Sequence, residues 1–226
     1  MALTETLSKN LHAVRDRIAR ACDHAGRDPG EIELVAVSKA HSLDSIRAAH
    51  DVGLRVFGEN YAQELAQKAD ALQDLSDIRW RFIGHLQRNK AKLVERANAS
   101  VDTVDSLRLA EALSTRAARR RVPTEVLIQV NVGREPQKSG CDPESVSDLV
   151  GAVRALSGLR LEGLMTVAPH DDDPDDARPF FASLRELAAA HGLPVCSMGM
   201  SHDLEAAIAE GTTMLRVGTA LFGPRG

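Results

Sequence analysis

The strongest constraint on the fold is an alternation of two hydrophobic patterns along the chain. Residues 32–37 form a short, nearly continuous apolar run, which is typical of a parallel strand buried on both faces. An amphipathic segment follows, with Ser42 as its predicted N-cap and Gly53 as its end. The same pair of patterns then recurs. Further strands are predicted at 55–58, 79–84, 101–104, 124–132, 160–165, 195–198 and 214–217.

Helices are predicted between these strands, with short connections. They lie at 60–75, 87–97, 106–120, 143–156, 175–191 and 203–210, and a longer amphipathic helix that ends at Gly26 opens the chain. Strict strand–helix alternation implies parallel strands joined by right-handed crossovers. Eight such units favour an α/β fold of the (β/α)8 (TIM-type) barrel class, with each strand but the last followed by a helix. Residues 1–226 are expected to form one domain, with residues 1–27 as an extra helix packed on the barrel.

An open doubly wound sheet is the alternative fold. No GxGxxG or GxxxxGK[ST] motif follows any predicted strand, so the usual nucleotide sites of that fold are missing from the sequence. The formal net charge of −4 argues against a protein that binds nucleic-acid backbones. The 3 cysteines are far apart, which predicts a reducing, cytoplasmic location without a disulfide framework. No secretion signal or membrane-spanning run is recognised.

The barrel prediction places functional groups where the strands end. In such barrels the active residues lie at the carboxyl ends of the strands and in the loops that follow. Polar residues stand at nearly every predicted strand exit, whereas the strand bodies are apolar. Closure makes the last strand the neighbour of the first. Lys39, Arg216, Gly218 and Thr219 are therefore predicted to line one side of one pocket.

Two short segments are candidates for binding a phosphate group. Met200-Ser201 and Gly218-Thr219 lie in the loops after the seventh and eighth strands, which form the recurrent phosphate site of these barrels. Two roles are open to Ser201, namely capping the helix at Asp203 and donating its hydroxyl to a phosphate. The alternative is that the glycines only permit a tight turn and that Ser201 only caps its helix.

Lys39 is the candidate nucleophile. A lysine at a strand end is most often a solvated charge, but one that faces a pocket between apolar strand ends has a lowered pKa and forms an imine with an aldehyde. An imine-forming lysine beside a phosphate site is typical of a pyridoxal 5′-phosphate site. A phosphosugar Schiff-base aldolase offers the same two elements, so both functions remain open from the residues alone.

Several motifs together resemble those of the pyridoxal phosphate homeostasis family. They are VAVSK (35–39), FGENYAQE (57–64), RFIGHLQRNK (81–90), QVN (129–131), KSG (138–140), GLMT (163–166) and SMGMSHDLEAAIAEGTTMLRVGTALFG (197–223). The resemblance spans residues 32–223 in the same order. It departs from the family at 40–42, where many relatives have a threonine and a proline, and at Arg88, where a small residue is usual.

The resemblance implies a barrel similar to the N-terminal domain of alanine racemase, which binds pyridoxal phosphate as an imine. Lys39 matches the imine lysine, and Ser201, Gly218 and Thr219 match the phosphate contacts, with Met200 adjacent. Arg216 matches the arginine that faces the pyridine nitrogen, and Asn60 lies in the segment near the ring. The family further implies a role in vitamin B6 homeostasis, with apoenzymes that require the cofactor as partners.

A carrier is favoured over an enzyme. An arginine at the pyridine nitrogen keeps that nitrogen unprotonated, which makes the ring a poor electron sink. The sequence ends soon after the eighth strand, and its one tyrosine is Tyr61, so no second catalytic domain and no facing tyrosine are expected. A racemase-like amino-acid enzyme is the alternative, with the roles of His85 and Lys138 open. A monomer is expected, since a closed barrel completes its own core.

No metal site and no catalytic cysteine are expected. The 8 histidines include no HExxH pair. The acidic run 170–176 lacks the spacing, glycine and terminal glutamate of a calcium-binding EF-hand loop. The arginines at 116 and 119–121 are interpreted as the solvated basic end of a helix.

Overall fold

A closed barrel of parallel strands forms the centre of the molecule. The structure is a computed structural model that describes residues 2–169 and 171–224. The strands follow one another around the barrel in chain order, and β8 pairs with β1 to close it. They are β1 (Glu33–Val37), β2 (Val56–Glu59), β3 (Arg79–Phe82), β4 (Ser100–Val104), β5 (Thr124–Gln129), β6 (Leu159–Met165), β7 (Val195–Ser197) and β8 (Met214–Val217). Closure confirms the predicted (β/α)8 barrel, and the open sheet is wrong.

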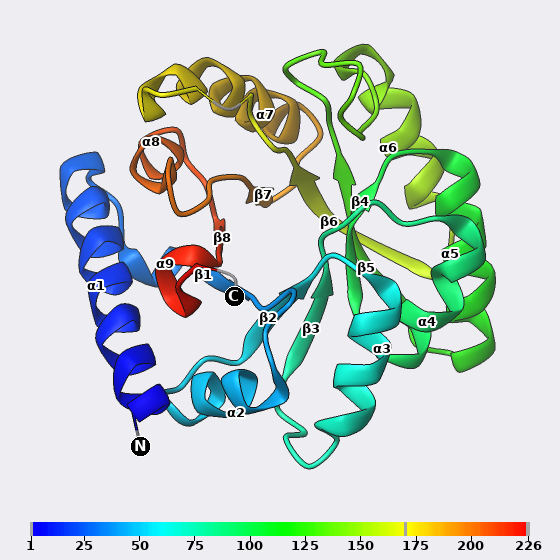
Figure 1. The fold of residues 1–226 in the computed structure, drawn as a ribbon. Helices are drawn as coiled ribbons and strands as arrows, with labels where there is room; N and C mark the ends of the chain where they lie inside the picture. Colours follow the sequence, from blue (N-terminus) through cyan, green and yellow to red (C-terminus); the bar gives the residue numbers. More distant parts are fainter. Residues whose placement is uncertain (1, 170, 225–226) are drawn as a thin grey trace.

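Helices surround the barrel and cover the outer face of its strands (Figure 1). They are α1 (Ala2–Ala25), α2 (Leu43–Asp51), α3 (Ala62–Ala71), α4 (Ala91–Arg96), α5 (Leu107–Arg120), α6 (Val146–Arg154), α7 (Arg178–Ala190), α8 (Leu204–Ala209) and α9 (Thr219–Phe222). Short 3₁₀ turns precede three of them, namely η2 (Arg88–Lys90), η3 (Pro143–Ser145) and η4 (Pro174–Ala177), and η1 (Pro29–Glu31) leads into β1. The α-helices α4, α6 and α7 therefore begin several residues after their predicted starts, because the first turn of each is a 3₁₀ turn.

The extra N-terminal helix α1 lies outside the barrel against α8, α9 and α2 (Figure 1). Its apolar stripe is buried, as the spacing of Leu7, Leu11 and Val14 predicts. An ion pair and a hydrogen bond also hold α1 against α8 and α9. Arg17 pairs with Glu205 on α8 through two contacts of 2.7 Å, and Asn10 Nδ2 donates to Leu221 O on α9 at 2.8 Å. Helix α1 thus connects α8 and α9, which flank the last strand, with α2, which follows the first strand.

Two features of the fold differ from the sequence-based expectation. A short helix, α9, follows the last strand, because Leu221 N and Phe222 N both donate to Gly218 O and Leu221 is buried beneath α1. The strand bodies are also not uniformly apolar. Arg81 on β3 and Asp102 on β4 lie inside the barrel, 7% and 0% exposed, where they form a two-bonded ion pair of 2.8 and 2.9 Å. The pair satisfies charges that apolar neighbours alone would leave unpaired.

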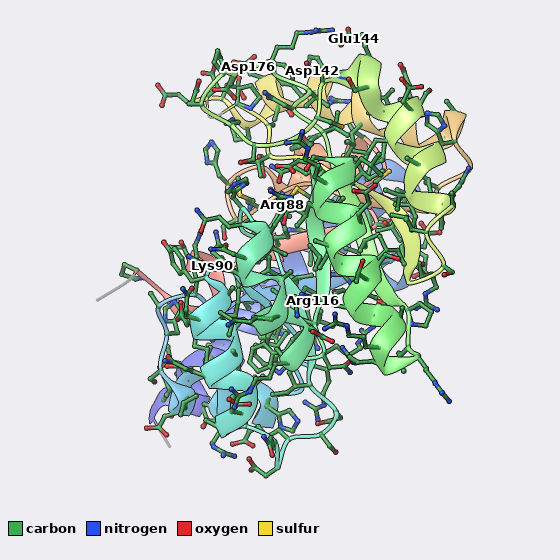
Figure 2. The ribbon with its side chains drawn as sticks, turned by 90° about the vertical axis from the view of Figure 1, so that its right-hand side faces the viewer. Arg88, Lys90, Arg116, Asp142, Glu144 and Asp176 are labelled. Carbon is green, nitrogen blue, oxygen red and sulfur yellow. The ribbon has the colours of Figure 1, made fainter. Side chains whose placement is uncertain are left out.

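Figure 2 labels one residue from each of the two charged segments set aside above, Arg116 and Asp176. Arg116 on α5 pairs with Glu95 at 3.2 Å, and Arg120 donates to Glu95 O at 3.0 Å, so part of the basic run is used within the fold. Asp142, Glu144 and Asp176 lie together toward one edge (Figure 2). His170 lies outside the described residues. Within residues 2–169 and 171–224 no cluster of metal-ligating side chains is found, and no helix has the length and apolarity to cross a membrane.

Candidate functional site

A cavity of about 380 Å³ opens at the carboxyl ends of the strands. All seven residues predicted for the site line it, so the barrel brings together segments from both ends of the chain. They are Lys39, Asn60, Met200, Ser201, Arg216, Gly218 and Thr219. The pairing of Val35 with Arg216 places the exit of β1 directly beside the exit of β8, as the closure argument predicts. Their roles in binding stay predictions.

Lys39 stands two residues beyond β1. The strand is buried from Val35 to Val37, and Ser38 N donates to Gly58 O at 3.0 Å, which continues the pairing with β2 past the end of the strand. Lys39 itself is partly exposed and lines the cavity. The backbone that carries the amine is thus part of the barrel wall, and the side chain extends from a rigid element into the opening.

Arg216 is the buried charge of the site. It is 4% exposed, and its Nη1 donates to Ser197 Oγ and its Nη2 to Thr166 O, both at 2.7 Å. Burial lowers the pKa of Arg216 to about 10, an effect that the Asp102 and Asp203 carboxylates oppose. The guanidinium therefore remains protonated at neutral pH and presents a fixed positive charge to the cavity.

The loop after β7 is fixed by the side chain of Asp203 and by α1. Asp203 Oδ1 accepts from Met200 N at 2.6 Å, and Arg17 Nη1 on α1 donates to Ser201 O at 3.0 Å. Gly199 has φ +93°, and a Cβ there would lie 2.4 Å from Ala207 Cβ, so only glycine fits this turn. The helix that follows begins at Leu204, with Asp203 at its N-cap position.

Ser201 does not cap that helix, so the capping role considered above is wrong. Its Oγ instead lies 3.4 Å from Ala220 N, a long contact that joins the loop after β7 to the segment after β8. Gly218, in the second segment, approaches the first strand so closely that a Cβ would lie 3.3 Å from Val37 Cβ. The two predicted phosphate-binding segments are therefore adjacent, on the same side of the cavity as the exit of β1.

Asn60 carries an unsatisfied polar atom. Its Oδ1 is buried and has no hydrogen-bond partner. Such atoms are rare in folded proteins and indicate an absent ligand or water. The neighbouring Gly84 permits a close approach of β3 and β2, because a Cβ there would lie 2.1 Å from Asn60 O. Asn60 thus lines the cavity on a tightly packed backbone and carries a buried, unpaired acceptor.

Two histidines at the cavity were not predicted. His41 lines it and stacks on Phe222 of α9, with ring centroids 4.7 Å apart, and His202 lines it beside Ser201. Both follow strand exits, so the barrel rule that selected Lys39 and Ser201 applies equally to them. His85 and Lys138 do not line this cavity. His85 Nδ1 contacts Ser139 Oγ at 3.1 Å, and Lys138 Nζ donates to Ala168 O at 2.9 Å.

No activated thiol or tyrosine is found at the cavity lining. Burial raises the pKa of Cys22, of Cys196 and of Cys141, the last to about 11, so none of these thiols is activated as a nucleophile. Tyr61 is 60% exposed and does not line the cavity. Lys39 is the one lysine of the described lining and stays the predicted nucleophile.

The fold and the cavity define a barrel of the alanine racemase N-terminal domain class, and the family model with that description matches residues 10–226. A relative from Pseudomonas aeruginosa named pyridoxal phosphate homeostasis protein is 45% identical over 222 residues, which cover 97% of this chain and 96% of the relative. One of the same name from Aquifex aeolicus is 41% identical over 223 residues, covering 96% and 97%. The chain belongs to the pyridoxal phosphate homeostasis protein family, which confirms the resemblance noted in the sequence.

A solved structure supports the same family assignment. The structure of PipY from Synechococcus elongatus with pyridoxal phosphate bound superposes with a TM-score of 0.84 at 34% identity, covering 96% of this chain and 100% of PipY. The similarity therefore extends over the whole barrel, including the strand exits that form the cavity.

Proposed function

We propose that this chain binds pyridoxal 5′-phosphate in the cavity, holds it as an imine on Lys39, and serves vitamin B6 homeostasis as a carrier of the cofactor. The observation that carries the proposal is the convergence of Lys39, Arg216 and the two phosphate-type segments on one cavity. The names of the relatives and the bound cofactor of PipY support it.

The residues at the cavity fit this cofactor. Ser201, Gly218 and Thr219 are assigned to the phosphate, with Met200 beside them, because hydroxyl and backbone groups of adjacent loops suit an anion. Arg216 is assigned to the pyridine nitrogen, and Asn60 offers its unpaired Oδ1 near the ring. Lys39 supplies the amine. Its nitrogen would bond to the aldehyde carbon of the cofactor, and the two hydrogens of the neutral amine would leave with the aldehyde oxygen as water.

The carrier role rests on Arg216. Because its pKa is about 10, the arginine donates to the pyridine nitrogen without giving up a proton at neutral pH. The ring then stabilises a carbanion poorly, and the loss of an amino-acid α-proton is slow. No tyrosine among the described residues lines the cavity to act as a second acid or base. A racemase-like enzyme remains the alternative because His41 and His202 line the same cavity.

Further parts of the proposal concern partners and location. We expect apoenzymes that require pyridoxal phosphate to receive it from this protein, which would act as a monomer in the cytoplasm. The three cysteines are free, as a reducing compartment requires. We expect no nucleic-acid or membrane partner, in keeping with the net charge of −4.

The test combines spectroscopy with chemical trapping. The purified protein mixed with pyridoxal phosphate should absorb in the visible range as an imine, and borohydride should fix the cofactor to the peptide that contains Lys39. A label found by mass spectrometry only on another lysine, such as Lys138, would refute the assignment. A Schiff-base aldolase would form an imine only with its sugar phosphate and would stay colourless with pyridoxal phosphate.

A further inference from the structure

Lys68 on α3 is a buried lysine to which the proposed function gives no role. Lys68 is only 6% exposed. Its ammonium group donates to Ser38 O, Glu59 Oε1 and Glu64 Oε1, each at 2.7 Å. An ammonium group has three donors and no acceptor, so these bonds saturate it. Lysine is almost never fully buried unless it is paired, and here both of its charged partners lie near the exits of β1 and β2.

Two bonds of this cluster reach the backbone on either side of Lys39. Lys68 binds the carbonyl of Ser38, which belongs to the peptide unit before Lys39. Glu64 Oε1, which accepts from Lys68, also accepts from Ala40 N at 2.7 Å, in the peptide unit after Lys39. Both peptide units that flank Lys39 are thus bound to one buried cluster of charges.

Glu59 joins this cluster to the barrel. It ends β2, is 0% exposed, and its Oε1 accepts from Ser38 Oγ at 2.6 Å as well as from Lys68. Ser38 is therefore held by its side chain, by its carbonyl and by its N–H. The position of Lys39 relative to β2 is fixed by side chains that do not touch the cavity.

The backbone at Ala40 requires such support. Its φ is +62°, in the left-handed region that residues with a Cβ disfavour. Conformations of this kind persist where the surroundings hold them, and they concentrate at functional sites. The bond from Ala40 N to Glu64 stabilises a turn that the local sequence does not prefer.

We propose that Lys68, Glu59 and Glu64 are positioning residues that hold the backbone on both sides of Lys39, so that its amine is directed into the cavity. The inference rests on the proposed function, because it assumes that Lys39 captures the aldehyde. The cluster acts through orientation: a lysine held on a fixed backbone spends more of its time near the aldehyde carbon than one on a mobile turn. It leaves the phosphate-binding segments unchanged.

The experiment compares Glu64→Ala with Glu64→Gln. Glutamine keeps an Oε1 that accepts from Ala40 N, whereas alanine removes it. Imine formation is followed by stopped-flow absorbance over a range of pyridoxal phosphate concentrations. We expect the limiting rate to fall about 10-fold or more in Glu64→Ala, the factor for one lost hydrogen bond to a charged group, and to fall less in Glu64→Gln, which keeps a neutral acceptor. The half-saturating concentration should not change in either variant.

A second variant addresses Lys68 without leaving a buried charge unpaired. Combining Glu59→Gln with Lys68→Met removes both charges together, and we expect the same loss of limiting rate. Glu186→Ala, at an exposed position on α7, is the control. The thermal midpoint of each variant is measured alongside, so that a rate lost through unfolding is recognised.

The outcomes separate this inference from the function on which it rests. A wild-type limiting rate in both Glu64→Ala and the double variant would overturn the positioning role. A Glu64→Gln variant as slow as Glu64→Ala would overturn the role of Glu64 as an acceptor for Ala40. If the wild-type protein acquires no borohydride label at Lys39, the proposed function itself fails.

Discussion

Arg216 on β8 and Ser197 on the neighbouring strand β7 are joined by a buried hydrogen bond, with Arg216 Nη1 2.7 Å from Ser197 Oγ. Because the second terminal nitrogen of the guanidinium binds Thr166 O, β8 is tied to β7 and to the exit of β6 by one side chain. Two hydrogen bonds fix the plane of the guanidinium group. The ammonium group of a lysine is a compact charge with rotatable donors and could not be oriented in this way. The charge that faces the cavity is therefore fixed in direction as well as in sign.

This arrangement predicts that the loaded protein does not exchange the α-proton of amino acids. After incubation with L-alanine in heavy water, α-deuterium measured by mass spectrometry should not exceed that of a control with free pyridoxal phosphate. The reason is the proposed contact of the protonated Arg216 with the pyridine nitrogen, which would leave that nitrogen without a proton. Catalytic deuterium incorporation that disappears in Lys39→Ala would instead establish the racemase-like alternative.

Ser201→Ala should weaken the binding of pyridoxal phosphate more than that of pyridoxal. Only the phosphorylated ligand supplies the anion that the hydroxyl is expected to bind. The loss of one hydrogen bond to a charged group costs about 1.5–3 kcal/mol, or roughly 10- to 150-fold in affinity. Equilibrium titration of both ligands measures this difference, with Ser8→Ala on the exposed side of α1 as a control. Equal weakening of both ligands would show that Ser201 acts only in the loop.

Asp102→Ala should destabilise the barrel strongly. The substitution leaves the buried Arg81 guanidinium without its two-bonded partner, and breaking a buried pair in this way costs about 3–5 kcal/mol. The double variant Arg81→Met with Asp102→Leu should lose less than the sum of the two single variants. Urea unfolding of the wild type, Arg81→Met, Asp102→Leu and the double variant gives the coupling energy between the two side chains. The exposed pair Arg160–Glu125 is the comparison, with an expected coupling below about 1 kcal/mol. Additive losses at Arg81 and Asp102 would contradict the prediction.

Glu59→Gln should change how stability depends on pH. Burial raises the pKa of the Glu59 carboxyl above its usual value of 4.5, although Lys68 and Ser38 oppose the shift and Glu64 adds to it. The folded state therefore binds this proton more tightly than the unfolded state, and its stabilising effect is lost as the pH rises from about 4.5 through the raised pKa.

The measurement is the difference in unfolding free energy between the wild type and Glu59→Gln. Glutamine does not titrate, so the wild type should lose stability relative to the variant as the pH rises from 4 to 8. Carboxyl groups that do not interact with Glu59 titrate alike in both proteins and cancel in the difference. A difference that stays constant, or that grows in favour of the wild type, would contradict the prediction.

The sequence predicted the cavity well because one rule decides it. Parallel strands that alternate with helices must close with their carboxyl ends together, so Lys39 and Arg216 had to approach each other once the eight strands were recognised. The burial of Lys68 was not predictable in the same way. Glu64 and Lys68 are four residues apart on a helix, a spacing that is typical of an exposed ion pair. Only the approach of Ser38 and Glu59 from other segments makes the position buried.

The interior of the barrel escaped prediction for a related reason. Arg81 lies between Trp80 and Phe82 on β3, and alternation along a strand does not tell which face is the interior and which faces the helices. Both aromatic side chains are buried in the outer layer, whereas Arg81 points inward to Asp102. The helix α9 was missed because a single turn of four residues has too short a pattern to recognise.

The cavity lies where β8 pairs with β1, so its two sides come from segments that are synthesised at different times. Lys39 follows β1, the first strand of the barrel to be synthesised, whereas Arg216 lies on β8, the last, and Gly218 and Thr219 follow β8. Contacts between such distant segments form late, because the whole intervening loop must be closed before they can form. A chain interrupted before β8 would carry Lys39 without the segment after β8 that we propose for the phosphate. Retention of the ligand would then report that the barrel has closed.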